Sequence, residues 1–248
     1  MRTLLLPDAD LLGHAATDTA LVPGREVEQR LRRVLRLGDG AELRVSDGRG
    51  HFALARLEPE GLRLSTPTTR PAPLPVRLCL GCGWIKGERM DWLVEKATEL
   101  GADRIVPLEL EHAVVRLDGA RAERRRERLQ AVADAAFEQS GRSHRCRVAT
   151  SSALATLLRA SPGNRVLFAD EAGGAPVAEA LEGVDLAASD REAAELLLLV
   201  GSEGGWEAGE RAQLLAAGAR PVGLGPAILR AETAALALVL RTTVALGG

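Results

Sequence analysis

Hydrophobic and polar residues follow one pattern up to about residue 75 and another beyond it. In the second part, short apolar runs alternate with segments whose apolar residues recur every three or four positions, which predicts strands alternating with helices. Such alternation indicates an α/β fold with a mainly parallel sheet that is covered on both faces. The predicted strands are 76–81, 104–110, 165–170, 195–200 and 220–224, and the predicted helices are 88–100, 120–140, 175–181, 207–217 and a final helix after 230.

The first part of the chain has shorter apolar segments separated by turns. AELRV (41–45) and HFALARL (51–57) alternate in polarity around an Asp-Gly turn, which predicts a β-hairpin. The preceding REVEQRLRRVLRLGDG predicts a helix that Gly38 ends. Four prolines within 66–75 are typical of a linker. We therefore expect a small β-rich domain at 1–70, a linker at 71–75 and a larger domain at 76–248.

Composition narrows the class of protein. The chain has a formal net charge of −2, which argues against a strongly basic protein that coats nucleic acid without sequence preference. A local basic face is still compatible with this charge. Acidic residues and a proline near the N-terminus replace the long apolar core of a signal peptide, and no apolar run reaches the roughly 18–20 residues that span a bilayer. We expect a cytoplasmic protein without a membrane partner.

Cys79 and Cys82 have the spacing of a zinc or redox motif. They fall within a predicted strand, however, where residues three apart point to opposite faces. No second pair of this kind follows, and the four histidines lack ligand spacing. The sequence therefore predicts small buried residues here and no metal site.

Glycine-rich turns follow three of the predicted strands: FADEAGG (168–174), VGSEGGW (200–206) and LGPAILRAET (224–233). Ligands of open α/β sheets bind beyond the carboxyl ends of the strands, and glycine lets a ligand approach the backbone. The turns match neither a phosphate loop nor the dinucleotide-binding glycine motif, which argues against a nicotinamide-dependent enzyme. They predict one pocket for a largely apolar cofactor with a hydroxylated sugar.

VGSEGG and LGPAILRAETAALA resemble the cofactor loops of SPOUT-class methyltransferases, in particular the RsmE-like family, which methylates N3 of one uridine in 16S ribosomal RNA. KGERMDWLVEKATELGADRIVPL (86–108) resembles that family's lysine–glycine turn and the helix after it, and EQSGR (138–142) matches a family signature. RLRRVLRLGDG followed by a hairpin resembles its PUA-like RNA-binding domain.

The resemblance implies a C-terminal SPOUT domain with a trefoil knot, a PUA-like β-barrel domain at the N-terminus, and a homodimer formed through the apolar last helix. It also implies that S-adenosyl-L-methionine is the cofactor. The residues implied to bind it are Gly201, Glu203, Gly204, Gly205, Leu224, Gly225, Ile228, Leu229, Arg230, Glu232, Thr233 and Ala234.

The implied substrate is uridine 1498 of 16S rRNA in assembled small ribosomal subunits. Uridine N3 must lose its proton to attack a methyl group, so a base or a cation that stabilises the anion is needed. We expect Arg230 to stabilise charge, and Glu138 and Glu203 are candidate bases. The residues expected to contact RNA are Arg30, Arg32, Arg33, Arg36, Lys86 and Arg142.

The chain departs from the family pattern at four places. In the N-terminal helix the family's frequent histidine is absent, and Gln29 or Arg30 occupies that neighbourhood. Ser202 replaces a proline, which predicts a looser turn, and Ala227 replaces an arginine. Glu207 and Glu210 stand where the family has a Ser-x-x-Glu capping box, which predicts a weaker cap. Two alternatives remain open: a knotted methyltransferase that acts on ribose 2′-oxygens, and a degenerate protein that binds RNA or cofactor without transferring a methyl group.

Overall fold

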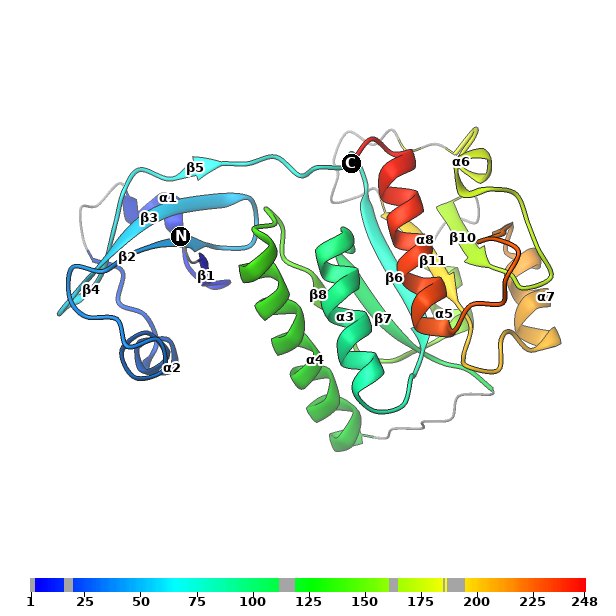
Figure 1. Cartoon of the computed structure of the whole chain (residues 1–248), viewed down its shortest axis with the longest axis horizontal. Helices are drawn as coiled ribbons and strands as arrows, with labels where there is room; N and C mark the ends of the chain where they lie inside the picture. Colours follow the sequence, from blue (N-terminus) through cyan, green and yellow to red (C-terminus); the bar gives the residue numbers. More distant parts are fainter. Residues whose placement is uncertain (1–2, 16–19, 112–118, 161–164, 185, 187–194) are drawn as a thin grey trace. The chain divides into compact units, whose positions relative to one another are not determined.

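The computed structural model describes residues 3–15, 20–111, 119–160, 165–184, 186 and 195–248 (Figure 1). The chain divides into two compact units. The first comprises Met1–Ala72 and Phe137–Arg145, and the second comprises Pro73–Ala136 and Cys146–Gly248. The segment 137–145 therefore returns to the first unit, a feature that the predicted single linker did not include.

The first unit is built on a mainly antiparallel sheet with strand order β1-β2-β3-β4, and β5 pairs with the other end of β3. Among the described strands of this first sheet, β1 and β2 are the one parallel pair. Leucines such as Leu31, Leu43 and Leu62 form its buried core. The elements are β1 (Thr3–Leu5), α1 (Leu11–Ala15), α2 (Arg25–Gln29), η1 (Arg30–Val34), β2 (Glu42–Ser46), β3 (His51–Glu58), β4 (Gly61–Leu64) and β5 (Thr68–Thr69).

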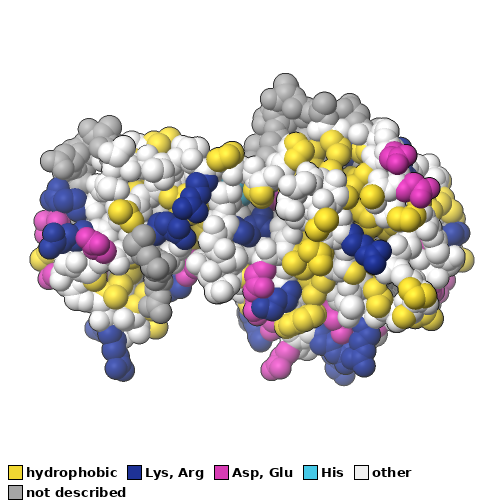
Figure 2. Space-filling model, turned by 45° about the horizontal axis from the view of Figure 1, so that its top comes forward, with side chains coloured by type: hydrophobic (Ala, Val, Ile, Leu, Met, Phe, Trp, Pro, Cys, Tyr) yellow, Lys and Arg dark blue, Asp and Glu magenta, His cyan; other side chains and the backbone are white. Residues whose placement is uncertain are grey.

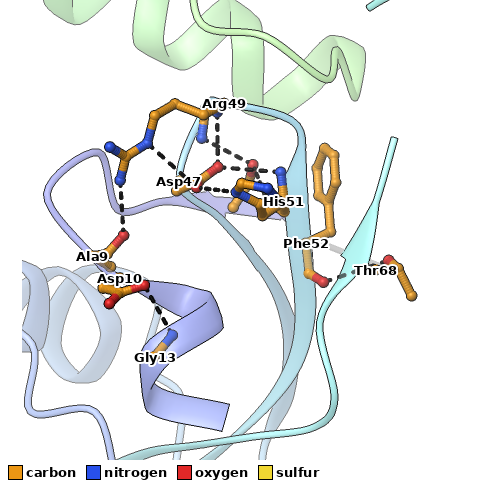
Figure 3. Close-up of polar contacts among 10 residues, drawn as sticks. Ala9, Asp10, Gly13, Asp47, Arg49, His51, Phe52 and Thr68 are labelled. Atoms are coloured by element: carbon orange, nitrogen blue, oxygen red, sulfur yellow. Dashed lines mark hydrogen bonds and ion pairs between the residues drawn. The ribbon is translucent and has the colours of Figure 1, made fainter. Parts of the chain in front are cut away.

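The predicted hairpin is confirmed as β2 and β3, and Asp47 holds its turn (Figure 3). The Asp47 carboxylate accepts hydrogen bonds from the backbone N–H groups of Arg49 (2.7 Å) and His51 (3.2 Å), and it lies 2.7 Å from His51 Nδ1. Burial alone would raise the pKa of Asp47, but these bonds favour the charged form and hold the pKa below its usual value.

The predicted helix of the first unit begins as expected but ends earlier, so the predicted end at Gly38 is wrong. After α2 the backbone widens into η1, where the Leu35 N–H donates to the Arg30 carbonyl at 2.8 Å. Arg36 then adopts φ +54°, the left-handed conformation that usually falls to glycine at a helix end. The Leu37 N–H donates to the Leu31 carbonyl and closes this end.

Part of the proline-rich segment is a strand, which corrects the linker prediction for 66–75. Thr68 and Thr69 keep their backbone N–H groups between the prolines, and they pair with Phe52 and His51 of β3. The Arg70 guanidinium that follows lies 4.9 Å from the centroid of the Phe52 ring. A cation over an aromatic ring adds to the pairing that holds this segment on the first unit.

The second unit contains an entirely parallel sheet in strand order β12-β10-β11-β6-β7-β8, with β9 also pairing with β7. The last turn of α4 belongs to the first unit. The elements are β6 (Arg77–Gly83), α3 (Glu88–Leu100), β7 (Arg104–Glu109), α4 (Gly119–Ser140), β8 (Arg147–Val148), β9 (Ser152–Ala153), α5 (Leu154–Arg159), β10 (Val166–Ala169), α6 (Val177–Ala180), β11 (Glu195–Val200), α7 (Ala208–Ala216), β12 (Arg220–Val222) and α8 (Ala231–Ala245).

Both faces of this sheet are buried, as the apolar run of β11 predicted. Leu196 and Leu198 pack in the cluster that includes α3 and α8, whereas Leu197 and Leu199 pack in the cluster that includes α5 and α7. Cys82 lies in the first cluster and Cys79 in the second, so the predicted opposite orientation of these thiols is confirmed. Burial raises the pKa of Cys82 to about 12, and burial raises that of Cys79 further.

Helix α8 packs along α3 and over the centre of the sheet (Figure 1). Leu238 and Val239 are fully buried, and the Thr243 hydroxyl donates to the Leu100 carbonyl at 3.0 Å. Strand order does not define how the chain threads, so the trefoil knot stays a prediction. Among the described residues, no helix is both long and apolar enough to cross a membrane.

Candidate active site

Three loops at one edge of the second sheet enclose a cavity of about 300 Å³. They follow β10, β11 and β12, which are parallel neighbours, so the carboxyl ends of these strands lie together. The start of α8 closes the cavity through Ala231 and Ala234. The three glycine-rich turns that the sequence analysis singled out are therefore brought into one site.

The loop after β11 is held by its own side chain and by close backbone packing. The Ser202 hydroxyl accepts from the Gly204 N–H and donates to the Gly205 carbonyl, both at 3.3 Å. A Cβ on Gly201 would lie 2.8 Å from the backbone of Gly205, so this turn requires glycine. The expectation that Ser202 loosens the turn is wrong, because the hydroxyl bonds across it.

Trp206 and Asp170 join the loops to the sheet. The Trp206 indole N–H donates to the Ala169 carbonyl at 2.8 Å, and its ring meets Phe168 edge-to-face. The buried Asp170 carboxylate accepts from Arg211 Nε at 2.8 Å and from the Ala172 N–H at 3.1 Å. Both side chains line the cavity, but their bonds are directed at the protein, so they hold its shape.

The loop after β12 offers backbone donors to a ligand. Within the described part of the chain, the N–H groups of Leu224 and Gly225 and of residues 227–229 donate no hydrogen bond. Ile228 lines the cavity although 86% of its surface is exposed. This loop therefore suits a flat ring with polar atoms at its edge. The face of such a ring would cover Ile228, and its edge would accept hydrogen bonds from these N–H groups.

Most residues that the resemblance assigned to the cofactor line this cavity. These are Gly201, Glu203, Gly204, Gly205, Leu224, Gly225, Ile228, Leu229 and Ala234. Arg230 and Glu232 line a second cavity instead, and Thr233 lines neither. The set implied by the resemblance omitted Trp206 and Ala231, although both lie within the glycine-rich turns that predicted the pocket. Glu171, which also lines the cavity, is at a position that the FADEAGG turn did indicate.

The second cavity, of about 460 Å³, shares the residues Glu203 and Ala231 with the first. Its walls carry three cations, Lys86, Arg89 and Arg230, and the carboxylates of Glu203 and Glu232. Arg89 Nη1 donates to Glu203 Oε1 at 3.2 Å. Among the described residues, Lys86 and Arg230 form no ion pair. The cavity therefore presents two unpaired positive charges beside the first cavity.

Glu232 is the unusual residue of the second cavity. It is only 7% exposed, and its Oε2 atom has no hydrogen-bond partner among the described residues. A buried carboxylate oxygen without a donor costs roughly 1–3 kcal/mol, and the carboxylate gains back part of this cost from its position in the first turn of α8. A ligand that brings a donor to Glu232 would recover the remainder.

The expected RNA-contacting residues fall into two groups. Lys86 lines the second cavity, and Arg30, Arg32, Arg33, Arg36 and Arg142 belong to the first unit. Arg30 pairs with Glu138, and Arg32 pairs with Asp39 and donates to the Glu58 carbonyl. Arg33 and Arg36 are exposed and form no ion pair within the described residues, so their charges are available to a ligand.

Glu138, a candidate base, lies in the first unit and lines none of the described cavities. Its carboxylate accepts from Arg30 and, at 2.9 Å, from the backbone N–H of Leu5. These bonds tie β1, η1 and the end of α4 together. Glu138 thus has a structural role that the signature EQSGR did not reveal.

The cap of α7 is formed by two glutamates. Glu207 accepts from the Ala208 N–H, while Glu210 accepts from the backbone N–H groups of Glu207 (3.0 Å) and Glu111 (2.9 Å). Two glutamates thus form a complete capping box, and Glu210 also binds the segment after β7. Both reciprocal contacts of a capping box are present, and the expectation that this cap is weaker than one with serine stays a prediction.

Comparison with known proteins agrees with this geometry. Residues 72–242 match the family described as RNA methyltransferase domain, and residues 31–63 match the family described as RNA methyltransferase PUA domain. The expectations of an α/β methyltransferase domain with a mainly parallel sheet and of a PUA-like N-terminal domain are confirmed.

Three similar proteins from different bacteria share the same name. The chain is 36% identical to ribosomal RNA small subunit methyltransferase E of Mycobacterium bovis over 82% of this chain and 78% of that protein. It is 33% identical to the Bacillus subtilis protein of the same name over 68% of this chain and 66% of that protein. The crystal structure of the Neisseria gonorrhoeae protein of this name, bound to S-adenosyl methionine, is similar with a TM-score of 0.80 and 27% identity, over 96% of this chain and 95% of that one. The chain therefore belongs to the ribosomal RNA small subunit methyltransferase E family of S-adenosylmethionine-dependent RNA methyltransferases.

Proposed function

We propose that this protein transfers a methyl group from S-adenosylmethionine to N3 of one uridine of 16S rRNA, uridine 1498 in the family, within assembled small ribosomal subunits. The observation that carries this proposal is the adjacency of two cavities with different chemistry. One is apolar and rich in glycine and free backbone donors, and the other is lined by cations. The first suits the cofactor and the second suits the nucleotide.

The residues around the first cavity fit the cofactor. The N–H groups after β12 are suited to the edge of the adenine ring, and Ile228 to one of its faces. The Glu171 carboxylate can accept from ribose hydroxyls, and Gly201 and Gly205 leave space for close approach. The bound cofactor supplies an electrophilic methyl group on a sulfonium centre. The protein contributes orientation of the two reactants, which accounts for a large part of the rate of such a transfer.

Arg230 is proposed to stabilise negative charge on the target base. It precedes α8 at the wall of the second cavity and forms no ion pair in the described residues. A cation at this place favours the deprotonated form of the uracil ring, since loss of the N3 proton leaves charge on the flanking oxygens. This assigns Arg230 to the substrate side of the site.

RNA binding is proposed to involve Lys86 of the second unit and Arg30, Arg32, Arg33, Arg36 and Arg142 of the first. Clustered cations bind phosphates without reading sequence. We expect contact with RNA most strongly from Arg33 and Arg36, because their charges are unpaired within the described residues. Arg30 and Arg32 are already paired with Glu138 and Asp39, so an RNA phosphate must either join these carboxylates or replace them.

We also propose that the protein is a homodimer formed through α8 and α3. Hydrophobic side chains gather on the surface of the larger unit (Figure 2), and among the described residues Trp92, Leu240 and Val244 are exposed by 45–63%. Exposed apolar groups on adjacent helices are typical of an interface between subunits. A monomer in sedimentation experiments at micromolar concentration would contradict this proposal.

Two alternatives are distinguished by the product. A ribose 2′-O-methyltransferase would use the same cavities but leave the base unmodified. A degenerate protein would bind RNA or the cofactor without transferring a methyl group. Ala227 is consistent with this alternative, because it lies at the exposed rim of the first cavity where the family has arginine.

Primer extension on small subunits tests the proposal. A methyl group on N3 blocks base pairing, so reverse transcriptase should stop next to one uridine after treatment with the protein and S-adenosylmethionine. Subunits from a strain that lacks the protein and naked 16S rRNA provide the two substrates. We expect the stop in subunits and a much weaker one in naked RNA. Full-length extension in both, with cofactor binding intact by calorimetry, would contradict base methylation.

A further inference from the structure

We propose that the second cavity is the pocket for the uracil base and that the Glu232 carboxylate binds the N3–H group and accepts its proton. This inference rests on the proposed function and assigns the proton acceptor that the sequence left open. It moves Glu232 from the cofactor to the substrate.

The location of Glu232 supports this role. Glu232 lines the second cavity and is absent from the wall of the first, although its neighbour Ala231 lines both. A base in the second cavity therefore lies next to the cofactor cavity, because Glu203 and Ala231 line both. Transfer requires this adjacency, since the attacking nitrogen and the methyl carbon must come within contact distance.

Glu232 also has unmet hydrogen-bonding capacity among the described residues. Its Oε2 atom is buried and has no donor among the described residues, whereas the other carboxylate of the cavity, Glu203, is paired with Arg89. Buried carboxylates in folded proteins are almost always bonded. An acceptor left free at a cavity wall indicates a ligand that supplies an N–H or O–H group.

The set of charges that lines the cavity also fits uracil. The pairing edge of uracil presents an acceptor, a donor and an acceptor: one carbonyl oxygen, N3–H and the other carbonyl oxygen. Within the part of the chain that the structure describes, Lys86 and Arg230 form no ion pair and Glu232 Oε2 has no donor, so these three groups supply the complementary set. Cytosine has an acceptor at N3 and a donor beside it, so it would place an acceptor against the carboxylate. The cavity thus discriminates between the two pyrimidines.

The proposed step is balanced. The N3 proton moves to the Glu232 carboxylate, and the electron pair left on N3 forms a bond to the methyl carbon. The carbon–sulfur bond breaks, and its electrons remain on the sulfur of the product S-adenosylhomocysteine. Lys86 and Arg230 carry the charge that develops on the two carbonyl oxygens. Glu232 then loses the proton to water, and Arg89 and Glu203 are the other charged groups that line this cavity.

The test uses the full-length variant Glu232→Gln, which keeps the size of the side chain and removes its basicity. We expect single-turnover transfer to small subunits to fall by about 100-fold or more. The affinity for S-adenosylmethionine, measured by calorimetry, should stay within about twofold, because Glu232 lies outside the first cavity. Glu179→Gln is the matched control: Glu179 is exposed on α6 and lines none of the described cavities, so its change should leave both quantities unchanged.

A readout specific to proton transfer separates catalysis from structure. Subunits reconstituted with 5-fluorouridine carry a more acidic N3–H, so Glu232→Gln should regain much of its lost rate on them, and its rate on uridine should rise more steeply with pH than that of the wild type. Glu232→Asp, which retains a carboxylate, should keep intermediate activity. This variant also controls for a folding defect in the glutamine variant.

Three results would overturn the inference: an active Glu232→Gln variant, loss of cofactor binding in that variant, or an inactive variant that the acidic substrate does not rescue. Failure of the proposed function has a different signature. The wild type itself would then give no N3-methylated product, and no proton would need an acceptor at Glu232.

Discussion

Single glycines determine the shape of the cofactor cavity. A Cβ on Gly174 would lie 2.5 Å from the backbone of Pro221, and one on Gly201 would lie 2.8 Å from the backbone of Gly205. Real Cβ atoms do not approach backbone this closely, so any other residue must displace a neighbouring loop. Because the loops after β10, β11 and β12 pack against one another, one displaced loop changes the whole cavity.

The variant Gly201→Ala is expected to reduce affinity for S-adenosylmethionine by about tenfold or more and to lower the melting temperature. Gly209→Ala on α7 is the matched control, because a Cβ there meets nothing within 4 Å. Alanine in an exposed helix should stabilise the protein by about 0.5–1 kcal/mol. Calorimetry and thermal unfolding of both variants check this pair, and equal cofactor affinity in both would contradict the account.

Sequence reasoning at the residue scale succeeded where a residue type has one dominant use. The glycines of the three turns and the buried Cys79 and Cys82 are examples. It failed where a side chain reaches a partner distant in sequence. Trp206 bonds to Ala169, and Glu138 pairs with Arg30, which is 108 positions away. Only the fold brings such partners together.

At the scale of elements, capping and turn geometry fix where helices and strands begin. Helix α3 (Glu88–Leu100) matches its prediction at both ends, because Gly87 and Gly101 bound a clear apolar repeat. The short β8 and β9 were not predicted, since two-residue strands leave no periodic pattern. Helix α7 begins as predicted, but the two-glutamate box that stabilises it required the structure.

The two glutamates of this box should differ in their contribution to stability. Glu210→Ala leaves two partly buried N–H groups without their charged acceptor and is expected to lower the free energy of unfolding by about 2–3 kcal/mol. Glu207→Ala removes one cap bond and should cost about 1 kcal/mol. Urea unfolding of the two variants measures the difference, and an equal or larger loss in Glu207→Ala would be inconsistent with the dual role of Glu210.

The hairpin of β2 and β3 predicts a dependence on pH. The folded pKa of Asp47 lies below its ordinary value of 3.8, so the charged carboxylate stabilises the fold above that pH, and this stabilisation is lost as the pH falls through the lowered pKa. Asp47→Asn should therefore lower stability by about 1–2 kcal/mol at pH 7. The gap to the wild type should shrink below about pH 4.

Urea unfolding followed by circular dichroism at both pH values measures this gap. Asp39→Asn is the control, because Asp39 is half-exposed and forms a surface ion pair with Arg32. A gap for Asp47→Asn that stays constant or widens in acid would show that the hydrogen bonds do not depend on the charge.

At the scale of the whole molecule, the apolar surface of α8 predicts assembly. Leu240→Glu places a charge in the proposed interface and should convert a dimer to a monomer at micromolar concentration. Leu54→Glu, on β3 of the first unit, alters a leucine of similar exposure and should leave the assembly intact. Sedimentation velocity distinguishes them. Identical behaviour of the two variants would place the interface elsewhere.

The sequence predicted the overall plan: a β-rich unit and a parallel α/β unit whose glycine-rich turns after β10, β11 and β12 line one cavity. Two whole-molecule features were not predictable. The segment 137–145 joins the first unit although it begins with the last turn of α4, a helix whose other residues belong to the second, and Lys86 meets Arg230 and Glu232 in one cavity. Both depend on long-range packing, which leaves no local pattern in the chain.

The central claim is that a methyl group leaves a cofactor held by the first cavity and arrives on N3 of a uridine in the second. Its most direct test incubates purified protein with S-adenosylmethionine carrying an isotopically labelled methyl group and small subunits from a strain that lacks the protein. Mass spectrometry of the digested rRNA then identifies the labelled nucleoside. The account predicts label in 3-methyluridine alone. Label in a 2′-O-methyl nucleoside, or none at all while cofactor binding is intact, would contradict it.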